Sequence, residues 1–171
     1  MKRVSTSRVA TLTLTLLVSI PMRASAKELG TRGKTTYLSP GIETGLTWHY
    51  GGEGFGTTLG LRMSLNDVGQ HFSVPVAWRG VYGRVLRDFK TESWRTAFGY
   101  GVGVLFLGLE AGVAVHVDDQ TTKLGAEAAM LGTIGHVGIH VRHTQFFDRP
   151  AVTEIGLRGS WPIKIQNRTK K

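Results

Sequence analysis

The chain has 171 residues, a formal net charge of +9 and no cysteine. The length is that of a single domain. The absence of cysteine excludes a disulfide framework and thiol chemistry.

The first 26 residues predict a secretory signal peptide. Lys2, Arg3 and Arg8 precede an apolar stretch at 9–20, and 24–26 has the small-residue pattern of a cleavage site. The apolar stretch is shorter than the ~20 residues that a membrane-spanning helix needs, so an uncleaved anchor is the less favoured alternative. The segment holds four cations and no acid, so its removal lowers the formal charge from +9 to +5.

After the signal the sequence predicts three further segments. Residues 27–35 form a polar leader, 36–165 a β-barrel, and 166–171 a polar basic tail. Basic tails bind nucleic acid or anionic lipid in some proteins. For an exported protein we expect no nucleic-acid partner and favour a solvated tail.

The predicted barrel contains eight runs in which apolar residues alternate with small or polar ones, the pattern of β-strands. The runs cover 37–50, 55–66, 72–79, 93–104, 108–118, 123–130, 136–144 and 154–165. Short connections predict an all-β, antiparallel, up-and-down order. The third run loses its alternation after Gly80, where we expect a bulge.

The small and polar face is predicted to point inward. Glycine recurs on this face, and exposed glycine weakens a strand, whereas the narrow lumen of an eight-stranded barrel needs tiny residues among large ones. Aromatic residues gather at strand ends, as in the interfacial girdles of membrane barrels. The predicted rims are Trp48, Tyr50, Phe55, Trp94, Phe146 and Phe147 at one end, and Phe72, Phe106 and Trp161 at the other.

In this pattern the chain resembles the small eight-stranded outer-membrane barrels of the outer-membrane protein A and X type. The resemblance covers about residues 36–165 and rests on the strand pattern. It implies a transmembrane barrel in a bacterial outer membrane, in contact with outer-membrane lipid. Members of this group usually end on an aromatic residue, whereas the last predicted strand here ends at Ile165.

Both termini of an even-stranded barrel lie on one side, here the periplasmic side. The predicted outer loops are then 51–54, 87–92, 118–121 and 147–150, and the inner turns lie near 67–70, 105–107 and 132–135.

Charged residues on the inward face predict a network in the lumen. The candidates are Glu43, Glu110, Glu127 and Glu154 with Arg62, Arg79, Arg95, Arg142 and Arg158. Hairpin geometry places Glu43 opposite Arg62, and Arg142 between Glu127 and Glu154. Arg158 is expected to meet Glu43 across the barrel closure. The predicted network is therefore Glu43, Arg62, Glu127, Arg142, Glu154 and Arg158; the alternative is a set of weak surface pairs.

No catalytic residue, cofactor or metal site is expected. On a strand His136 and His140 lie ~13 Å apart, too far for one metal ion, and His143 has the opposite parity. Outer-membrane deacylases resemble the chain weakly around residues 142–144, but no serine follows two residues after His143. We therefore expect a non-enzymatic envelope or surface role. The alternatives are a soluble exported barrel that binds an apolar ligand, and an outer-membrane lipid-modifying enzyme.

Overall fold

The computed structural model describes residues 33–52, 54–71, 74–118 and 120–169. The predicted signal peptide and residues 27–32 of the predicted leader lie outside these described residues. Within the described ranges there is no helix long and apolar enough to cross a membrane.

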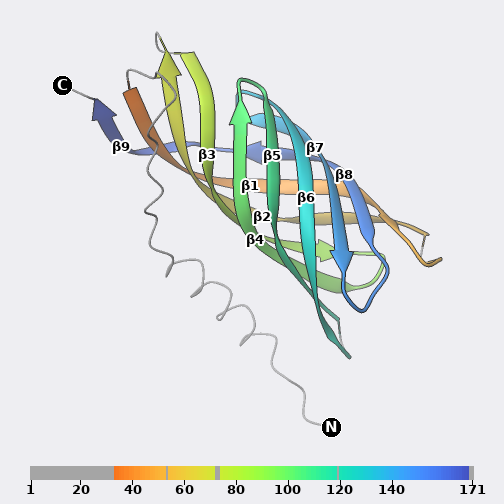
Figure 1. Cartoon of the computed structure of the whole chain (residues 1–171). Helices are drawn as coiled ribbons and strands as arrows, with labels where there is room; N and C mark the ends of the chain where they lie inside the picture. The colour runs from red at the N-terminus through yellow and green to blue at the C-terminus, as the bar shows by residue number, and fades with distance from the viewer. Residues whose placement is uncertain (1–32, 53, 72–73, 119, 170–171) are drawn as a thin grey trace.

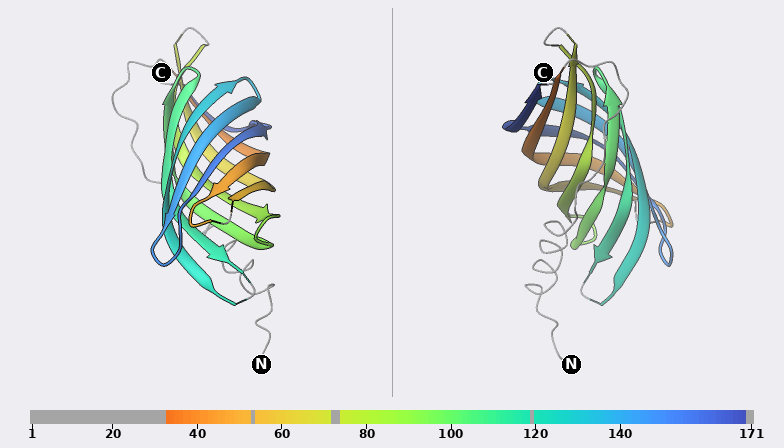
Figure 2. Two further views of the ribbon diagram at one scale, coloured as in Figure 1. Left: turned by 90° about the vertical axis from the view of Figure 1, so that its right-hand side faces the viewer. Right: turned by 60° about the vertical axis from the view of Figure 1, so that its left-hand side comes forward.

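The described residues form one closed antiparallel sheet (Figures 1 and 2). Its strands are β1 (Gly33–His49), β2 (Gly54–His71), β3 (Val74–Asp88), β4 (Ser93–Val104), β5 (Leu107–Val117), β6 (Thr122–Ile134), β7 (Val137–Phe146), β8 (Val152–Ser160) and β9 (Ile163–Thr169). Each strand from β1 to β7 pairs with the next, and β8 pairs with β1, which closes the barrel.

The last two strands share one position around the barrel. β8 pairs with residues 41–49 of β1, and β9 pairs with residues 33–38 of the same strand. Trp161 and Pro162 separate them, because proline has no N–H to donate to a ladder. The prediction of a closed eight-stranded antiparallel barrel is confirmed, with its eighth strand broken at this proline.

Several predicted boundaries are wrong. Residues 67–70 are not a turn: β2 continues through them to His71, and Thr36 Oγ1 donates a hydrogen bond of 2.8 Å to Asp67 across the β1–β2 pair. β3 likewise continues past Gly80 to Asp88. The barrel extends from residue 33 to residue 169, so its first residues come from the predicted leader and its last from the predicted tail.

Burial alternates along the strands as a barrel requires. In β7 the side chains of His140, Arg142 and Thr144 are buried inside, while Ile139 and Val141 are exposed outside. The outward face carries a belt of exposed apolar side chains on every strand except β3, among them Leu46, Leu61, Val102, Leu109, Met130, Ile139, Ile155 and Ile163. The polar face therefore lies inside the barrel and the apolar face outside.

Trp78 fills the lumen at the end where the chain enters β1. Its indole lies against Gly101 and Gly103 of β4 and Gly108 of β5, and a Cβ at Gly108 would stand 2.3 Å from Trp78 Cζ2. This corrects the expected parity of the third run, which placed Trp78 outside and Arg79 inside. Arg79 lies opposite Val102, an outward-facing residue.

Candidate functional site

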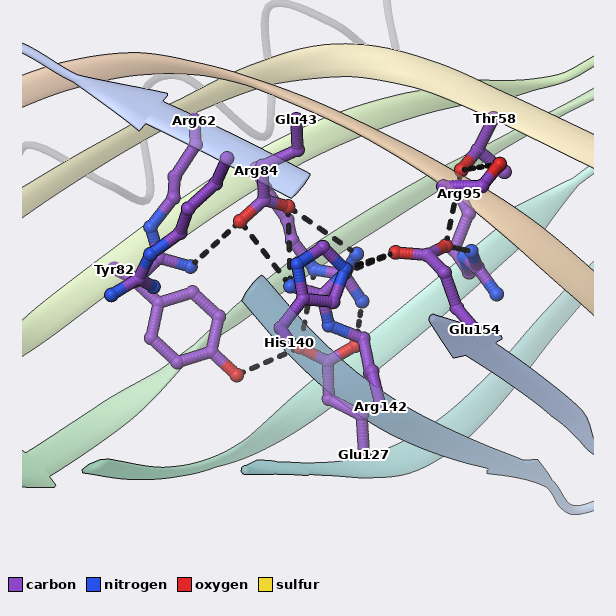
Figure 3. A network of polar contacts seen from close by, with 12 residues as sticks. Glu43, Thr58, Arg62, Tyr82, Arg84, Arg95, Glu127, His140, Arg142 and Glu154 are labelled. Atoms are coloured by element: carbon purple, nitrogen blue, oxygen red, sulfur yellow. Dashed lines mark hydrogen bonds and ion pairs between the residues drawn. The ribbon is translucent and has the colours of Figure 1, made fainter. Parts of the chain in front are cut away.

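The centre of the lumen holds a network of ion pairs contributed by strands on all sides of the barrel (Figure 3). Its glutamates are Glu43, Glu110, Glu127 and Glu154, and its arginines are Arg62, Arg84, Arg95, Arg142 and Arg158. All four glutamates are buried. Burial of so many charges is tolerated only when each is paired, because an isolated ion loses its hydration without compensation.

Arg142 of β7 bridges two carboxylates from neighbouring positions in the barrel. Its Nη1 donates to Glu154 Oε1 at 2.5 Å, and its Nη2 donates to Glu43 Oε2 at 3.1 Å. His140, two residues earlier on the same face, lies 2.8 Å from Glu154 Oε1 through Nε2. An ionised carboxylate only accepts hydrogen bonds, so His140 carries a hydrogen on Nε2. Arg95 contacts the other oxygen of Glu154.

A second cluster forms around Glu110 of β5. Arg62 donates to both of its oxygens, at 2.5 and 3.0 Å, in the bidentate arrangement that makes guanidinium–carboxylate pairs strong. Arg158 of β8 donates to Glu110 Oε1 at 3.1 Å. The guanidinium of Arg62 also stacks 4.5 Å above the ring centroid of Tyr82. Glu110 thus draws together strands that lie on opposite sides of the barrel.

Glu127 of β6 has different partners from those predicted. Arg84 of β3 pairs with it, and Tyr82 donates to Glu127 Oε1 at 2.7 Å. Arg142 is not opposite Glu127, since the register of β6 and β7 places Thr144 there and Ala129 opposite Arg142. The predicted Glu127–Arg142 pair is therefore wrong.

The other predicted pairs fare differently. Arg142 and Glu154 lie directly opposite each other, as the loop centred at residue 148 predicts. Arg158 is directly opposite Glu43, as expected, although the ion pair that it forms is with Glu110. Arg62 lies opposite Gly41 instead of Glu43. It reaches Glu43 diagonally, at 3.4 Å between Nη1 and Oε1.

The predicted network omitted Arg84, Tyr82 and His140, and the wider set of candidate inward-facing charges wrongly included Arg79. Arg84 and Tyr82 follow Gly80, where the alternation was expected to stop. In the structure the even-numbered series from Gly80 to Asp88 continues the inward face without interruption, and all five of its residues are buried.

A polar hollow of about 650 Å³ lies at the loop end of the barrel. Its lining residues are Lys90, Thr91, Glu92, His116, Asp118, Gln120, Thr121, Lys123, Asp148, Arg149 and Pro150, of which His116 is buried. Arg149 Nη1 contacts His116 Nε2, so this nitrogen accepts and the imidazole is neutral. Partial burial raises the pKa of Asp118, but hydrogen bonds from the backbone N–H groups of Gln120 and Thr121 outweigh it, so the pKa lies below its ordinary value.

The three histidines considered for metal binding are dispersed. His140 is buried in the lumen, whereas His136, in the β6–β7 turn, and His143, on the outer face of β7, are exposed. The described part of the chain contains no cluster of three or more histidine, aspartate and glutamate side chains arranged to hold a metal ion.

No family model matches the chain, and no curated protein matches it. Among solved structures, one described as "De novo design of transmembrane beta-barrels" is similar to it with a TM-score of 0.46 and 12% sequence identity. The similarity covers 79% of this chain and 100% of that chain.

Proposed function

We propose that the chain is a bacterial outer-membrane β-barrel with a non-enzymatic role in envelope structure or surface contact. The observation that carries the proposal is the distribution of polarity. Charged side chains are buried in the lumen, and large apolar side chains are exposed on the outside. Soluble monomers rarely expose contiguous apolar patches beyond a few hundred Å². A bilayer covers such a surface, and a closed barrel leaves no backbone edge unpaired inside it.

The soluble alternative required the Leu/Val/Phe face to point inward around a ligand. Leu46, Leu61 and Leu109 instead point outward, which counts against this alternative.

The lumen supports a structural role over transport or catalysis. Its arginines and glutamates are engaged with one another, and Trp78 packs into glycines at one end. An eight-stranded barrel is only wide enough for its side chains to fill the interior. The proposed barrel thus presents lipid-facing strands and four polar loops, and contacts with other envelope components would fall to these two surfaces.

Fractionation tests the proposal. After expression in a Gram-negative host, the protein should stay in the outer-membrane pellet after carbonate washing and should migrate differently on a detergent gel when it is not boiled. A matched variant, Leu109→Asp/Ile139→Asp, places two charges in the apolar belt and should lower the membrane-bound fraction. A protein released by carbonate, with unchanged gel migration, would contradict the proposal.

A further inference from the structure

Polar side chains form a hydrogen-bonded group on the outer apolar face, on β7 and β8 near the loop end. His143, Gln145 and Thr153 lie there on the outward side of the barrel. Their neighbours are Trp48 and Tyr50 at the end of β1, and Ala126 and Ala128 on β6. Polar or ionisable groups on a membrane-facing surface are costly and are functional candidates by default.

The strand registers place these residues in two rows across the outer surface. Trp48 lies opposite Thr153, Thr153 opposite His143, and His143 opposite Ala128. The next row toward the loops holds Gln145 opposite Ala126. On the β1 side of His143 the outer surface carries the large side chains of Trp48 and Tyr50. On the β6 side it carries the small side chains of Ala126 and Ala128, so the surface there is shallow.

Hydrogen bonds link the polar members. His143 Nδ1 lies 2.9 Å from Thr153 Oγ1, and Tyr50 Oη lies 3.3 Å from the same hydroxyl. The rings of Tyr50 and His143 are 6.2 Å apart in an edge-on arrangement. If Tyr50 donates to Thr153 and Thr153 donates to Nδ1, both hydroxyl hydrogens are used and the hydrogen of the neutral imidazole is on Nε2.

This position matches the depth of a lipid headgroup. His143 is three residues from the end of β7, which for a strand tilted by ~40° corresponds to roughly 8 Å along the membrane normal. Trp48 and Tyr50 are the residue types that concentrate at the membrane–water interface. In the row on the other side of His143 the outer surface is fully apolar, with Val141, Met130 and Ile155.

We propose that His143, Thr153 and Tyr50 form a binding site for the phosphate of a membrane lipid, whose acyl chains lie along the apolar outer surface that begins with Val141, Met130 and Ile155. The inference rests on the proposed membrane location. A phosphate is anionic and only accepts hydrogen bonds, which suits the N–H of the exposed imidazole of His143. The strand neighbours of His143 on this face are Val141, Gln145, Ala128 and Thr153, none of them acidic. No carboxylate among them would repel the phosphate.

Native mass spectrometry of the full chain, extracted in a maltoside detergent that contains no phosphate, tests this site. Dioleoyl phosphatidic acid should be retained in a one-to-one complex, and dioleoylglycerol, which has the same chains without the phosphate, should not. Loss of one hydrogen bond to a charged group predicts about tenfold weaker retention in His143→Ala. Thr153→Val should weaken it less, since that substitution removes only the support of the imidazole. His136→Ala, an exposed histidine in the β6–β7 turn, is the matched control and should retain the lipid fully.

Three results would overturn the site: equal retention by His143→Ala, equal retention of dioleoylglycerol, or displacement of the lipid by millimolar inorganic phosphate, which would indicate a site for free phosphate. Heat-dependent gel migration of each variant reports whether its barrel has formed. Release of the parent protein by carbonate would overturn the membrane location and the site together, whereas a correctly inserted barrel with unchanged lipid retention in His143→Ala would overturn the site alone.

Discussion

Arg142 is buried between two carboxylates, so its removal measures how far the barrel depends on pairing in the lumen. The side chain is 1% exposed and contacts both Glu43 and Glu154. Arg142→Ala leaves two buried carboxylates short of a partner and should lower the free energy of unfolding by ~3 kcal/mol, the scale of a broken buried pair. The midpoint of urea unfolding in detergent micelles gives the measurement.

Two further variants separate charge imbalance from lost packing at this position. Glu43→Gln in the Arg142→Ala background removes a matching negative charge and should recover part of the stability. Arg87→Ala, on the outer face where the guanidinium lies 5.4 Å from the ring centroid of Trp94, should cost less than ~1 kcal/mol. Equal effects of Arg142→Ala and Arg87→Ala would show that the lumen pairs are no stronger than surface contacts.

Tyr82 provides a neutral test of the same lumen. Its hydroxyl donates to Glu127 at 2.7 Å, and its ring is buried. Tyr82→Phe should lower the free energy of unfolding by ~1–2 kcal/mol, because a buried carboxylate loses one donor. Tyr100→Phe, on the exposed outer face of β4, is the control and should leave the urea midpoint unchanged. A shift in Tyr100→Phe as large as that in Tyr82→Phe would argue against a closed polar interior.

At the scale of elements, β3, β4 and β5 are held together by Trp78 and the glycines beneath it. A Cβ at Gly108 would stand 2.3 Å from Trp78 Cζ2, well inside van der Waals contact. Gly108→Ala should therefore destabilise the barrel by ~1–3 kcal/mol through overpacking, and Trp78→Ala should relieve part of that loss in the double variant.

The control for Gly108→Ala is the same substitution at another strand glycine, Gly132→Ala on β6. A Cβ at Gly132 meets Ile139 Cγ1 at 3.4 Å, an ordinary contact, so this substitution should leave thermal unfolding nearly unchanged. Two results would show that the Trp78 indole does not pack against Gly108. The first is a loss of stability in Gly108→Ala no larger than that in Gly132→Ala, and the second is a Gly108→Ala/Trp78→Ala variant that recovers none of the lost stability.

Alternation along the sequence was sufficient to predict the eight-stranded barrel and the inward face of every strand except β3, but not the register of the hairpins. In the β1–β2 turn Gly51 and Gly52 have φ values of 83° and 97°, so the turn is centred between them. The stretch 51–54 holds three glycines, and its composition does not show which pair adopts this conformation. Gly135, with φ of 60°, similarly shifts the β6–β7 turn by one residue from its expected centre. Each shift moves opposed residues by two positions, which explains the misplaced partners of Glu43 and Glu127.

The inward face of a strand was harder to predict where both of its faces carry apolar and charged side chains. In β3 the inward side chains include Leu86 and Tyr82 as well as Arg84, and the outward ones include Arg79 and Arg87 as well as Val85. Neither face is uniformly polar, so hydropathy alone does not separate them. The closed barrel determines which face of β3 points inward, because Arg84 of β3 pairs across the lumen with Glu127 of β6.

For the molecule as a whole, the connections that follow β1, β3, β5 and β7 lie at one end of the barrel, and the start of β1 lies at the other (Figure 1). If the termini are periplasmic, an epitope inserted after Gln120 should be detected by antibody on intact cells. The same epitope inserted after Leu105, in the β4–β5 turn, should be detected only after the outer membrane is permeabilised. The reverse pattern would invert the proposed orientation.

The central claim is that lipid surrounds the apolar outside of the barrel while the inside is shielded from it. Fluorescence quenching in phospholipid vesicles with acyl chains brominated near the headgroup tests this claim most directly. Two single-tryptophan variants are compared, one that retains Trp94 on the outer face and one that retains Trp78 in the lumen, with the other tryptophans replaced by phenylalanine. The proposed arrangement predicts strong quenching of Trp94 and little quenching of Trp78. Equal quenching of the two, stronger quenching of Trp78, or no quenching of Trp94 would contradict it.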